Sequence, residues 1–310
     1  MSIGAVVIGR NEGARLERSL QALAGQVAQI VYVDSGSTDG SVAAARGLGA
    51  EVVELDMQQP FTAARARNAG VAALSEEITL VQFLDGDCIL RDGWLAAAEA
   101  HLSAHPQLAV VCGRRREEHP QTSIYNSLVD AEWDTPPGEA RACGGDALMR
   151  LEALRAVGGY RAEMIAGEEP ELCQRLRRAG WQIWRLDAEM TWHDAQITRF
   201  SQWWRRSLRA GHAFAEGAAL HGAGPDRHWV AETRRAVLWG ALLPAVIFLL
   251  ALLTPWAAVG LMLLYPLQLL RLIWRGGAAW GFFTLLGKFP EALGVLKYHM
   301  RRDGRIIEYR

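Results

Sequence analysis

An Asp-Gly-Asp sequence, Asp85-Gly86-Asp87, carries the sharpest chemical signal in the chain. It follows an apolar run, Ile78–Leu84, of the kind that forms a buried strand. Two carboxylates that flank a glycine can reach one divalent cation, and the glycine lets the backbone come close. Mg²⁺ and Mn²⁺ prefer a few carboxylates together with phosphate oxygens and water. The motif therefore indicates a metal and phosphate site, with a plain Asp-Gly turn as the alternative.

A second acidic segment, Asp34–Gly40, also follows an apolar run. The segment has the composition of a turn, and Thr38 or Asp39 could cap the helix that follows it. An exposed carboxylate at a strand end, as expected for Asp34, could equally bind ribose hydroxyls or the N–H of a base. Both interpretations stay open from the residues alone.

Three glutamates surround a proline at Glu168-Glu169-Pro170-Glu171. Proline favours the first turn of a helix and Gly180 favours its end, so a helix is expected to start near Pro170. Acidic residues at a helix start can simply complement the helix dipole. Because Pro170 disfavours the α conformation of the residue before it, we expect Glu169 to project from an extended residue at the helix entrance. That position suits a general base.

The elements that must position these residues alternate between strands and helices. Strands are expected at Ala5–Ile8, Ile30–Val33, Glu51–Leu55, Ile78–Leu84 and Leu108–Cys112, and helices at Gly13–Ala24, Gly40–Leu48, Thr62–Leu74 and Trp94–Ser103. Such alternation predicts an α/β fold with a mostly parallel sheet and helices on both faces. Ligands bind beyond the carboxyl ends of such strands, so the polar residues after each run should meet at one edge.

Other segments indicate a loop, a candidate histidine ligand and the absence of two nucleotide-binding motifs. Residues 125–145 contain Pro136-Pro137-Gly138 and are expected to form a loop over the site. His193 could be a neutral imidazole ligand or a hydrogen-bonded histidine near a strand end. The chain lacks GxGxxG at its first helix and lacks GxxxxGK[ST], which disfavours dinucleotide-binding and P-loop folds.

Composition excludes further classes of protein. Lys and Arg number 33 and Asp and Glu 34, so the net charge of −1 argues against a nucleic-acid partner. Four cysteines without a CxxC pair indicate buried free thiols in a reducing compartment. The N-terminus starts directly with a strand-like run, so we expect no cleaved signal.

One stretch of the chain has the composition of a membrane segment. Between Arg235 and Arg271 lie 35 residues without a formal charge. A spanning helix needs about 20 apolar residues, so one crossing fits, and two short ones fit with a turn at Thr254-Pro255. A very apolar helix pair in a soluble core is the alternative. We expect one helix near Val237–Leu253 and a return near Ala257–Trp274.

Taken together, the chain resembles the family 2 glycosyltransferases with a GT-A fold over roughly residues 3–215. The matching segments are Val6–Glu12, Val33–Gly40, Ala66–Gly70, Phe83–Asp87, Gly144–Arg150, Gly158–Tyr160 and Gly167–Leu172. The resemblance implies that a nucleotide-diphospho-sugar donor contacts Asn11, Glu12, Asp34, Ser35, Asp39, Arg67, Asn68 and Asp85. It also implies Asp87 as the metal-binding carboxylate and His193 as a further metal ligand. Glu169 falls where the family usually has the Asp that acts as base, and Glu168 is the other candidate.

The resemblance implies an inverting transfer of a sugar to a hydroxyl acceptor, and the expected membrane segment favours a lipid-linked or envelope glycan as that acceptor. Mg²⁺ or Mn²⁺ would neutralise the diphosphate leaving group. Two alternatives remain. A nucleotidyltransferase usually has a Gly-rich, Lys/Arg-containing loop after its first strand, and Gly9–Arg15 fits that poorly. A non-catalytic membrane adaptor would be expected to lose the Asp-x-Asp or the base, and both are present.

Basic residues at both ends of the uncharged run set the expected topology. Arg234-Arg235 precede it, and Arg271, Arg275, Arg301, Arg302 and Arg305 follow it. Positive charge gathers on the cytoplasmic side, which favours a hairpin at the inner membrane with the catalytic domain facing the cytoplasm. Gln202–Arg206 partly resembles the QxxRW motif of processive synthases, but Arg206 replaces the tryptophan, and we expect an Arg/Trp helix at the membrane surface. The expected domains are residues 1–215 (catalytic), 216–235 (linker), 236–274 (transmembrane or re-entrant hairpin) and 275–310 (amphipathic, basic).

Overall fold

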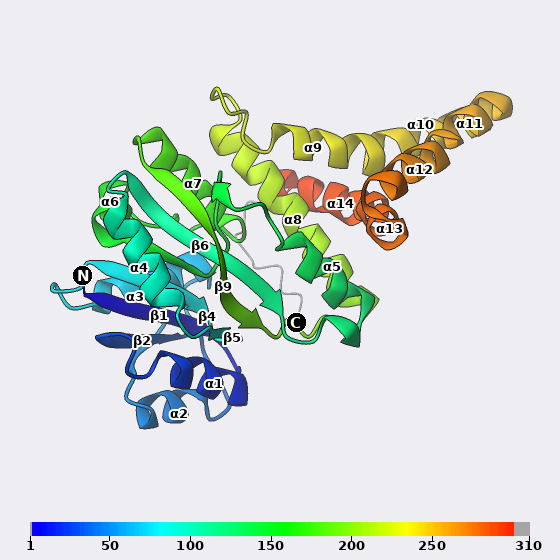
Figure 1. The fold of residues 1–310 in the computed structure, drawn as a ribbon. Helices are drawn as coiled ribbons and strands as arrows, with labels where there is room; N and C mark the ends of the chain where they lie inside the picture. Colours follow the sequence, from blue (N-terminus) through cyan, green and yellow to red (C-terminus); the bar gives the residue numbers. More distant parts are fainter. Residues whose placement is uncertain (1, 301–310) are drawn as a thin grey trace. The chain divides into compact units, whose positions relative to one another are not determined.

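The computed structural model describes residues 2–300, which form two compact units (Figure 1). The first unit comprises residues up to 122 together with 129–196. The second comprises 123–128 and the residues from 197 onward. The expected catalytic boundary near residue 215 therefore falls inside helix α8 (Phe200–His221). Residues 301–310 of the expected C-terminal segment, with Arg301, Arg302 and Arg305, lie outside the described residues.

A mixed sheet forms the centre of the first unit, in the order β3-β2-β1-β4-β8-β6-β9-β5 with β7 paired to β9. Its strands are β1 (Ile3–Gly9), β2 (Gln29–Asp34), β3 (Glu51–Glu54), β4 (Leu80–Asp85), β5 (Cys88–Leu90), β6 (Leu108–Glu117), β7 (Gly138–Glu139), β8 (Ala147–Arg150) and β9 (Gln182–His193). Strand β8 is antiparallel to both β4 and β6, so β6 runs in the same direction as β4. Strand β9 is parallel to β6.

The five strands expected from the sequence are confirmed. Ala5, Val6 and Val7 of β1 are fully buried, as are Val31, Tyr32 and Val33 of β2. A strand covered by helices on both faces buries every side chain, so it reads as a continuous apolar run rather than an alternating one. This is why composition alone located β1, β2 and β4.

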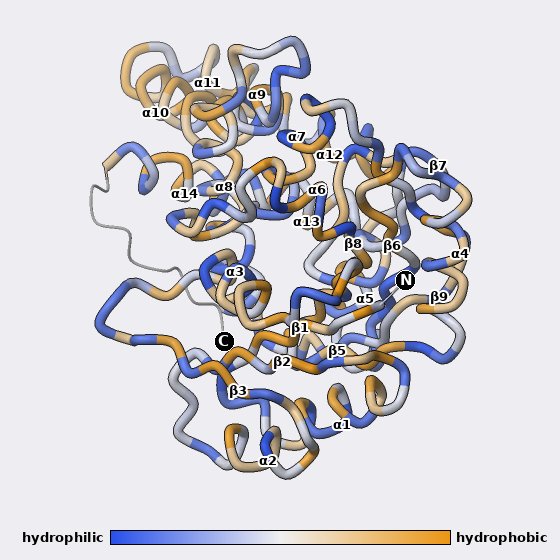
Figure 2. Tube along the Cα trace, turned by 90° about the vertical axis from the view of Figure 1, so that its left-hand side faces the viewer, coloured by the Kyte–Doolittle hydropathy of each residue, from blue (hydrophilic) through white to orange (hydrophobic). Residues whose placement is uncertain are grey.

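Helices cover both faces of the sheet. They are α1 (Ala14–Leu23), α2 (Ser41–Gly47), α3 (Ala63–Ala73), α4 (Trp94–Ala104), α6 (Leu151–Ala156) and α7 (Glu168–Arg178). Helices α1 and α2 lie on one face and α3 on the other (Figures 1 and 2). The predicted α/β class with a mostly parallel sheet is therefore confirmed.

The expected loop at residues 125–145 is partly wrong, because its first part is helix α5 (Ile124–Glu132). Ser123 begins this helix, since its Oγ accepts the backbone N–H of Asn126 at 3.0 Å. That bond satisfies a donor of the first helical turn. The Pro136-Pro137-Gly138 segment does remain outside regular helix, with β7 as its only short strand.

The second unit is helical. Its helices are α8 (Phe200–His221), α9 (Val230–Val237), the π-helical turn Leu238–Leu242, α10 (Leu243–Leu253), α11 (Pro255–Met262), α12 (Leu264–Gly276), α13 (Ala278–Leu286) and α14 (Lys288–Met300). Helices α8 and α14 approach closely at two glycines. A Cβ on Gly211 would lie 2.0 Å from the carbonyl oxygen of Glu291, and one on Gly294 would lie 2.0 Å from that of Leu208. Only residues without a side chain permit this helix contact.

The predicted Arg/Trp helix is present as the first turns of α8. Gln202 accepts the backbone N–H groups of Thr198 and Arg199 at 3.0 Å, so its side chain caps the helix. Trp203 is buried and contacts the ring of Phe283 at 5.0 Å between centroids. Gln202 and Trp203 therefore have structural partners within this unit.

Two helices of the second unit are long and apolar enough to cross a membrane. One runs over Val230–Leu253 (24 residues) and the other over Pro255–Gly276 (22 residues), with a break at Thr254. The expected pair of apolar helices and their turn are thus present. Leu253 and Trp256 beside the break are 80% and 88% exposed, and Figure 2 shows α10 and α11 as mostly hydrophobic. Such exposed apolar surface is typical of a segment that contacts lipid or a partner.

Candidate active site

The candidate site lies where the parallel strands of the first unit end. Strands β1, β2, β4, β6 and β9 all run in one direction, so their carboxyl ends share one edge of the sheet. Those ends carry Asp34, Asp85, Glu117 and His193. These four residues are far apart in the sequence, and the parallel strands bring them to the same edge of the sheet.

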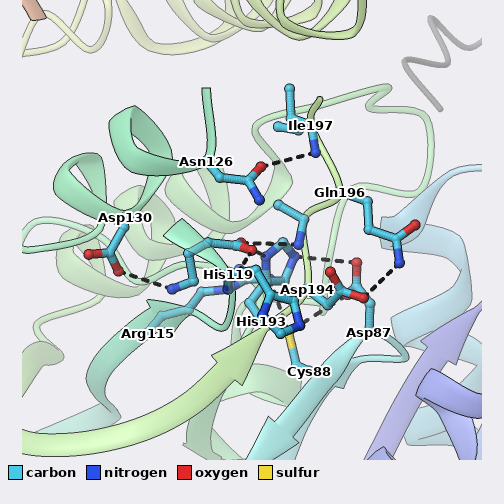
Figure 3. Close-up of polar contacts among 12 residues, drawn as sticks. Asp87, Cys88, Arg115, His119, Asn126, Asp130, His193, Asp194, Gln196 and Ile197 are labelled. Carbon is cyan, nitrogen blue, oxygen red and sulfur yellow. Dashed lines mark hydrogen bonds and ion pairs between the residues drawn. The ribbon is translucent and has the colours of Figure 1, made fainter. Parts of the chain in front are cut away.

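Asp87 and His193 face each other across this edge (Figure 3). Oδ2 of Asp87 lies 3.3 Å from Nε2 of His193, and both side chains are more than nine-tenths buried. The backbone fixes them, because the carbonyl of Asp87 accepts the N–H of Asp194 at 3.1 Å. Gly86 permits the turn between Asp85 and Asp87, since its N–H donates to Ile8 and a Cβ would lie 3.2 Å from that same carbonyl oxygen.

The pair fits a divalent cation. Two ligands at right angles, each about 2.1 Å from such an ion, lie about 3 Å apart, close to the separation of these two atoms. Burial, followed by the nearby Arg115 guanidinium, lowers the pKa of His193, which keeps its imidazole neutral and able to coordinate. The Sγ atom of Cys88 lies within 4.8 Å of a carboxylate oxygen of Asp87 and of a ring nitrogen of His193. A carboxylate and an imidazole are suitable ligands for Mn²⁺ or Mg²⁺.

Asp85 occupies a different environment from Asp87. Its Oδ1 accepts a hydrogen bond from Arg67 at 2.9 Å, and its Oδ2 accepts one from Arg115 at 3.1 Å. Burial alone would raise the pKa of Asp85, but the two guanidinium groups outweigh it and hold the pKa below its ordinary value. Gly145 packs against this pair, because a Cβ there would lie 2.7 Å from Nη2 of Arg67. The Asp85 carboxylate is thus ionised and already paired with two cations.

Arg67 links this edge to helix α7. Its side chain is 2% exposed, and Nη1 donates to Oε1 of Glu168 at 2.8 Å and lies 3.0 Å from Oε1 of Glu169. Nη2 of the same group bonds Asp85. One arginine on α3 therefore contacts three carboxylates from β4 and α7.

The expected extended conformation of Glu169 is wrong, because Glu168 and Glu169 both lie in α7. Gly167 is the N-cap and adopts a left-handed conformation with φ of 81°, so the helix begins at Glu168, two residues before Pro170. At that depth the missing N–H of proline belongs to the unpaired first turn and breaks no helical bond. The preference of the pre-proline residue is thereby overridden.

Glu168 and Glu169 differ in exposure. The side chain of Glu168 is 5% exposed and that of Glu169 is 15% exposed. Burial and the neighbouring Glu168 carboxylate raise the pKa of Glu169 to about 7, against the opposing effect of Arg67. A carboxyl group with a pKa near neutral pH can exchange a proton under physiological conditions.

Asp34 is not the exposed carboxylate expected from the sequence. It is 3% exposed, and its oxygens accept hydrogen bonds from the Tyr32 hydroxyl and from the N–H groups of Gly36 and Ser37, all at 2.9 Å. Gly36 has φ of 81°, which lets the chain fold back onto the carboxylate. Ser35, between them, is fully buried. Asp34 shapes the turn after β2.

The other nucleotide candidates also have partners within the protein. Asn11, with φ of 55°, joins two loops, because Ser37 Oγ accepts its N–H and its Oδ1 accepts the N–H of Thr38 at 2.7 Å. Glu12 pairs with Arg15 at 2.6 Å. Further candidates are fixed in the same way: Asp39 accepts the N–H of Ser41, and Asn68 exchanges two hydrogen bonds with the backbone of Tyr160.

Arg115, Glu117 and Asp146 belong to the site but were not among the predicted site residues. Asp146 accepts the N–H of Asp85 at 3.2 Å and lies 3.3 Å from Nε of Arg115. Arg115 and Glu117 follow the apolar run Leu108–Cys112, just as the predicted site residues follow theirs. The same rule, applied to this fifth run, would have found them.

The first unit of the chain matches a known protein family. The family model described as "Glycosyl transferase family 2" matches residues 5–156. The pre-mycofactocin glycosyltransferase of Mycobacterium tuberculosis is 29% identical over 244 residues, which are 72% of this chain and 48% of that protein. The succinoglycan biosynthesis protein ExoA of Rhizobium meliloti is 29% identical over 57% of this chain and 58% of its own length. The chain thus spans about half the length of the curated relatives it matches.

Solved structures are similar over nearly the whole chain. The mannosyltransferase PcManGT from Pyrobaculum calidifontis, solved with GDP-Man and Mn²⁺, has a TM-score of 0.67 at 19% identity and covers 97% of this chain and 88% of its own. Residues 1–349 of S. aureus TarS give a TM-score of 0.56 at 15% identity, covering 97% of this chain and 92% of that one. At these identities the likeness establishes the fold.

Proposed function

The chain carries a glycosyltransferase family 2 domain with the GT-A fold, and we propose that it transfers a sugar from a nucleotide-diphospho-sugar to a hydroxyl acceptor. The geometry of Arg67 carries this proposal. One guanidinium connects a carboxylate beside the Asp87–His193 pair, Asp85, with the carboxylate that titrates near neutrality, Glu169. Sugar transfer needs these two functions side by side: a site that accepts the diphosphate and a base for the acceptor.

Asp87 and His193 would hold the divalent ion, either Mg²⁺ or Mn²⁺. When bound, the ion would neutralise the charge that develops on the diphosphate leaving group. The facing Oδ2 and Nε2 atoms and the neutral imidazole support this assignment. The PcManGT structure, solved with GDP-Man and Mn²⁺, supports a metal of this class.

Glu169 would be the general base, with Glu168 in a supporting role. Glu169 is the more exposed of the two and has the raised pKa, whereas Glu168 is held by Arg67 deeper in the protein. The Glu169 carboxylate would take the proton of the acceptor hydroxyl as its oxygen attacks the anomeric carbon. The diphosphate would leave from the opposite face, so a single displacement inverts the configuration.

The ends of β1 and β2 would receive the nucleotide of the donor. Asn11, Glu12, Asp34, Ser35 and Asp39 line this stretch of the edge. Because Asp34 and Asn11 both bond the backbone of the loop after β2, they would act mainly by fixing the loop that meets the base and ribose. Arg67, Asn68 and Asp85 frame the stretch beside it.

The acceptor would be a lipid-linked or envelope glycan, and the site of action would be the cytoplasmic face of the inner membrane. The two apolar helices support membrane attachment. Val230–Leu253 would be about 36 Å long and Pro255–Gly276 about 33 Å, against a hydrocarbon core of about 30 Å. Their uncharged parts, 236–253 and 255–270, would be about 27 Å and 24 Å long, so the flanking arginines would extend toward the headgroups. Arginines at both ends of the pair favour a hairpin that leaves both ends in the cytoplasm, where nucleotide sugars are made. The name of the Rhizobium relative, a succinoglycan biosynthesis protein, supports a glycan product.

A donor panel with the purified full chain in detergent tests the activity. UDP-, GDP- and dTDP-sugars would be incubated with Mn²⁺ and a membrane lipid extract, and the nucleotide product identified by chromatography. A glycosyltransferase releases the nucleoside diphosphate and labels the acceptor. Release of sugar 1-phosphate instead would indicate a nucleotidyltransferase, and no turnover with any donor would favour the non-catalytic adaptor. The Asp87→Asn variant serves as the blank.

A further inference from the structure

Three side chains form a row across neighbouring strands beside the proposed metal ligands Asp87 and His193. Cys88 of β5 stands directly opposite His193 of β9, and Glu117 of β6 pairs with His193 on the other side. Residues opposite each other in a sheet project to the same face. His193 is therefore held between a thiol and a carboxylate, and Figure 3 shows Cys88 beside His193.

Glu117 is fixed in place by the backbone. It is 1% exposed, its Oε1 accepts the N–H of His119 at 3.2 Å, and its Oε2 accepts the N–H of Ala195 at 3.1 Å. Its own N–H donates to Oδ1 of Asp130 at 3.0 Å. A carboxylate with a backbone donor on each oxygen cannot rotate without breaking one of these bonds. It is a rigid acceptor.

The same Oε2 atom of Glu117 lies 3.6 Å from Nδ1 of His193. An ionised carboxylate can only accept, so a hydrogen on Nδ1 is favoured there. On the other side of the ring, Nε2 faces Oδ2 of Asp87 at 3.3 Å. With a cation bound between these two atoms, the lone pair of the neutral ring lies on Nε2 and the hydrogen on Nδ1, toward Glu117. Trp133 packs against the imidazole, nearly perpendicular to it, with 4.6 Å between ring centroids. Both the tautomer and the direction of the ring are thereby constrained.

We propose that Glu117 is a positioning residue that holds His193 in the tautomer and orientation required for binding a divalent cation. This inference rests on the metal site proposed above. Ligand histidines commonly donate their second N–H to a carboxylate, and loss of that partner weakens metal binding by about 10- to 100-fold. The Glu117 carboxylate faces three donors: the N–H groups of His119 and Ala195 and Nδ1 of His193. A glutamine at position 117 would turn its NH₂ group, which is also a donor, toward at least one of them.

Mn²⁺ binding to the full chain in detergent tests the proposal without relying on turnover. The dissociation constant would be measured by electron paramagnetic resonance with UDP or GDP present, for wild type, Glu117→Gln and the neighbouring Glu118→Gln. Glu118 is the matched control, since its carboxylate pairs with Arg18 instead. We expect about 10- to 100-fold weaker binding for E117Q and unchanged binding for E118Q.

A double variant separates positioning from a general structural effect. If Glu117 acts through His193, Glu117→Gln combined with His193→Ala should bind Mn²⁺ no more weakly than His193→Ala alone. Additive losses would overturn the proposal. Weakened binding in Asp87→Asn and His193→Ala together with wild-type binding in E117Q would overturn it while leaving the metal site intact. Unchanged Mn²⁺ binding in Asp87→Asn and His193→Ala would overturn the metal site, and this inference with it.

Nitrogen NMR reads the tautomer of His193 directly in the wild-type chain. With ¹⁵N-labelled histidine, the His193 signals are identified as those lost in His193→Ala. With Mg²⁺ and UDP or GDP bound, we expect the proton on Nδ1 and an unprotonated Nε2. A proton on Nε2 would overturn the proposal.

Discussion

Nη1 of Arg67 lies 3.0 Å from Oε1 of Glu169, an ion pair between helices α3 and α7 at the carboxyl edge of the sheet. The other nitrogen of the guanidinium, Nη2, bonds Asp85. Arg67 also opposes the burial that raises the pKa of Glu169, so it limits how far that pKa rises. The proposed base is therefore tuned by the same cation that neutralises the carboxylate beside the proposed metal ligand.

Replacing Asp87 with Asn should remove most transferase activity while the fold is retained. The amide is a weaker ligand for a hard cation, and loss of several kcal/mol of leaving-group stabilisation corresponds to about 10²–10³ in rate. Activity would be assayed with and without EDTA, and folding by thermal unfolding. Asp92→Asn, at an exposed position near α4, is the control. Full turnover of the wild type in EDTA would contradict a metal-assisted reaction.

Replacing Glu169 with Gln should lower kcat by about 10²–10⁴ because the acceptor hydroxyl loses its base. Binding of the nucleoside diphosphate should change little, since the base acts on the acceptor. Glu168→Gln should be milder, because Glu168 lies deeper and bonds Arg67. A crippled Glu168→Gln beside a mild Glu169→Gln would exchange the two roles.

The rate should rise with pH through about 7. Glu169 acts as a base only when deprotonated, and its pKa is raised to about 7, so kcat falls as the pH drops below that value. The Glu168 carboxylate contributes to that rise by charge repulsion. Glu168→Gln should therefore move the acidic limb of the kcat–pH profile to lower pH. A limb that stays in place or moves upward would show that another group controls it.

Replacing Gly211 with Ala should destabilise the helical unit. The added methyl group would meet the Glu291 carbonyl oxygen at 2.0 Å, and forcing α8 and α14 apart typically costs about 1–3 kcal/mol. Gly260→Ala in α11 is the matched control, because no atom lies within 4 Å of a Cβ there. Thermal unfolding in detergent should show a lower midpoint for G211A alone. Equal midpoints for the two variants would contradict the close helix contact.

Cysteine labelling should reveal a hairpin. In a background without the four native cysteines, a cysteine replacing Pro255 should react with an impermeant thiol reagent from outside the cell. One replacing His299 should react only after lysis; Arg310 is an equivalent site that lies outside the described residues. Protection of both positions would indicate a re-entrant hairpin, and external labelling at position 299 would refute a cytoplasmic C-terminus.

Much of the fold was predictable because the parallel strands are buried on both faces. The apolar runs of β1, β2 and β4 located these strands, and the polar residues after them located the edge. Helix α5 was not predicted, because Pro136-Pro137-Gly138 indicated a loop for the whole of residues 125–145. Its N-cap, Ser123, lies just before that segment.

The site was predictable in its residues more than in its geometry. Asp87 and His193 are 106 positions apart, and only the pairing of β5 with β9 brings them together. Asp34 was expected to be exposed because the sequence does not reveal that Gly36 and Ser37 fold back onto it. Glu117 follows the apolar run Leu108–Cys112 and could have been placed at this edge, but its contact with His193 depends on where β9 joins the sheet.

Strand β6 pairs with β9 irregularly, with register shifts between Cys112 and Arg114 and between Arg114 and Arg115. Bulges of this kind re-aim the side chains that follow them. Since successive strand residues alternate between faces, removing or adding one residue between Cys112 and Glu117 would turn Glu117 away from His193. The length of this short stretch is therefore as constrained as the identity of its residues, and insertions that the chain tolerates during evolution should fall elsewhere, in the loops.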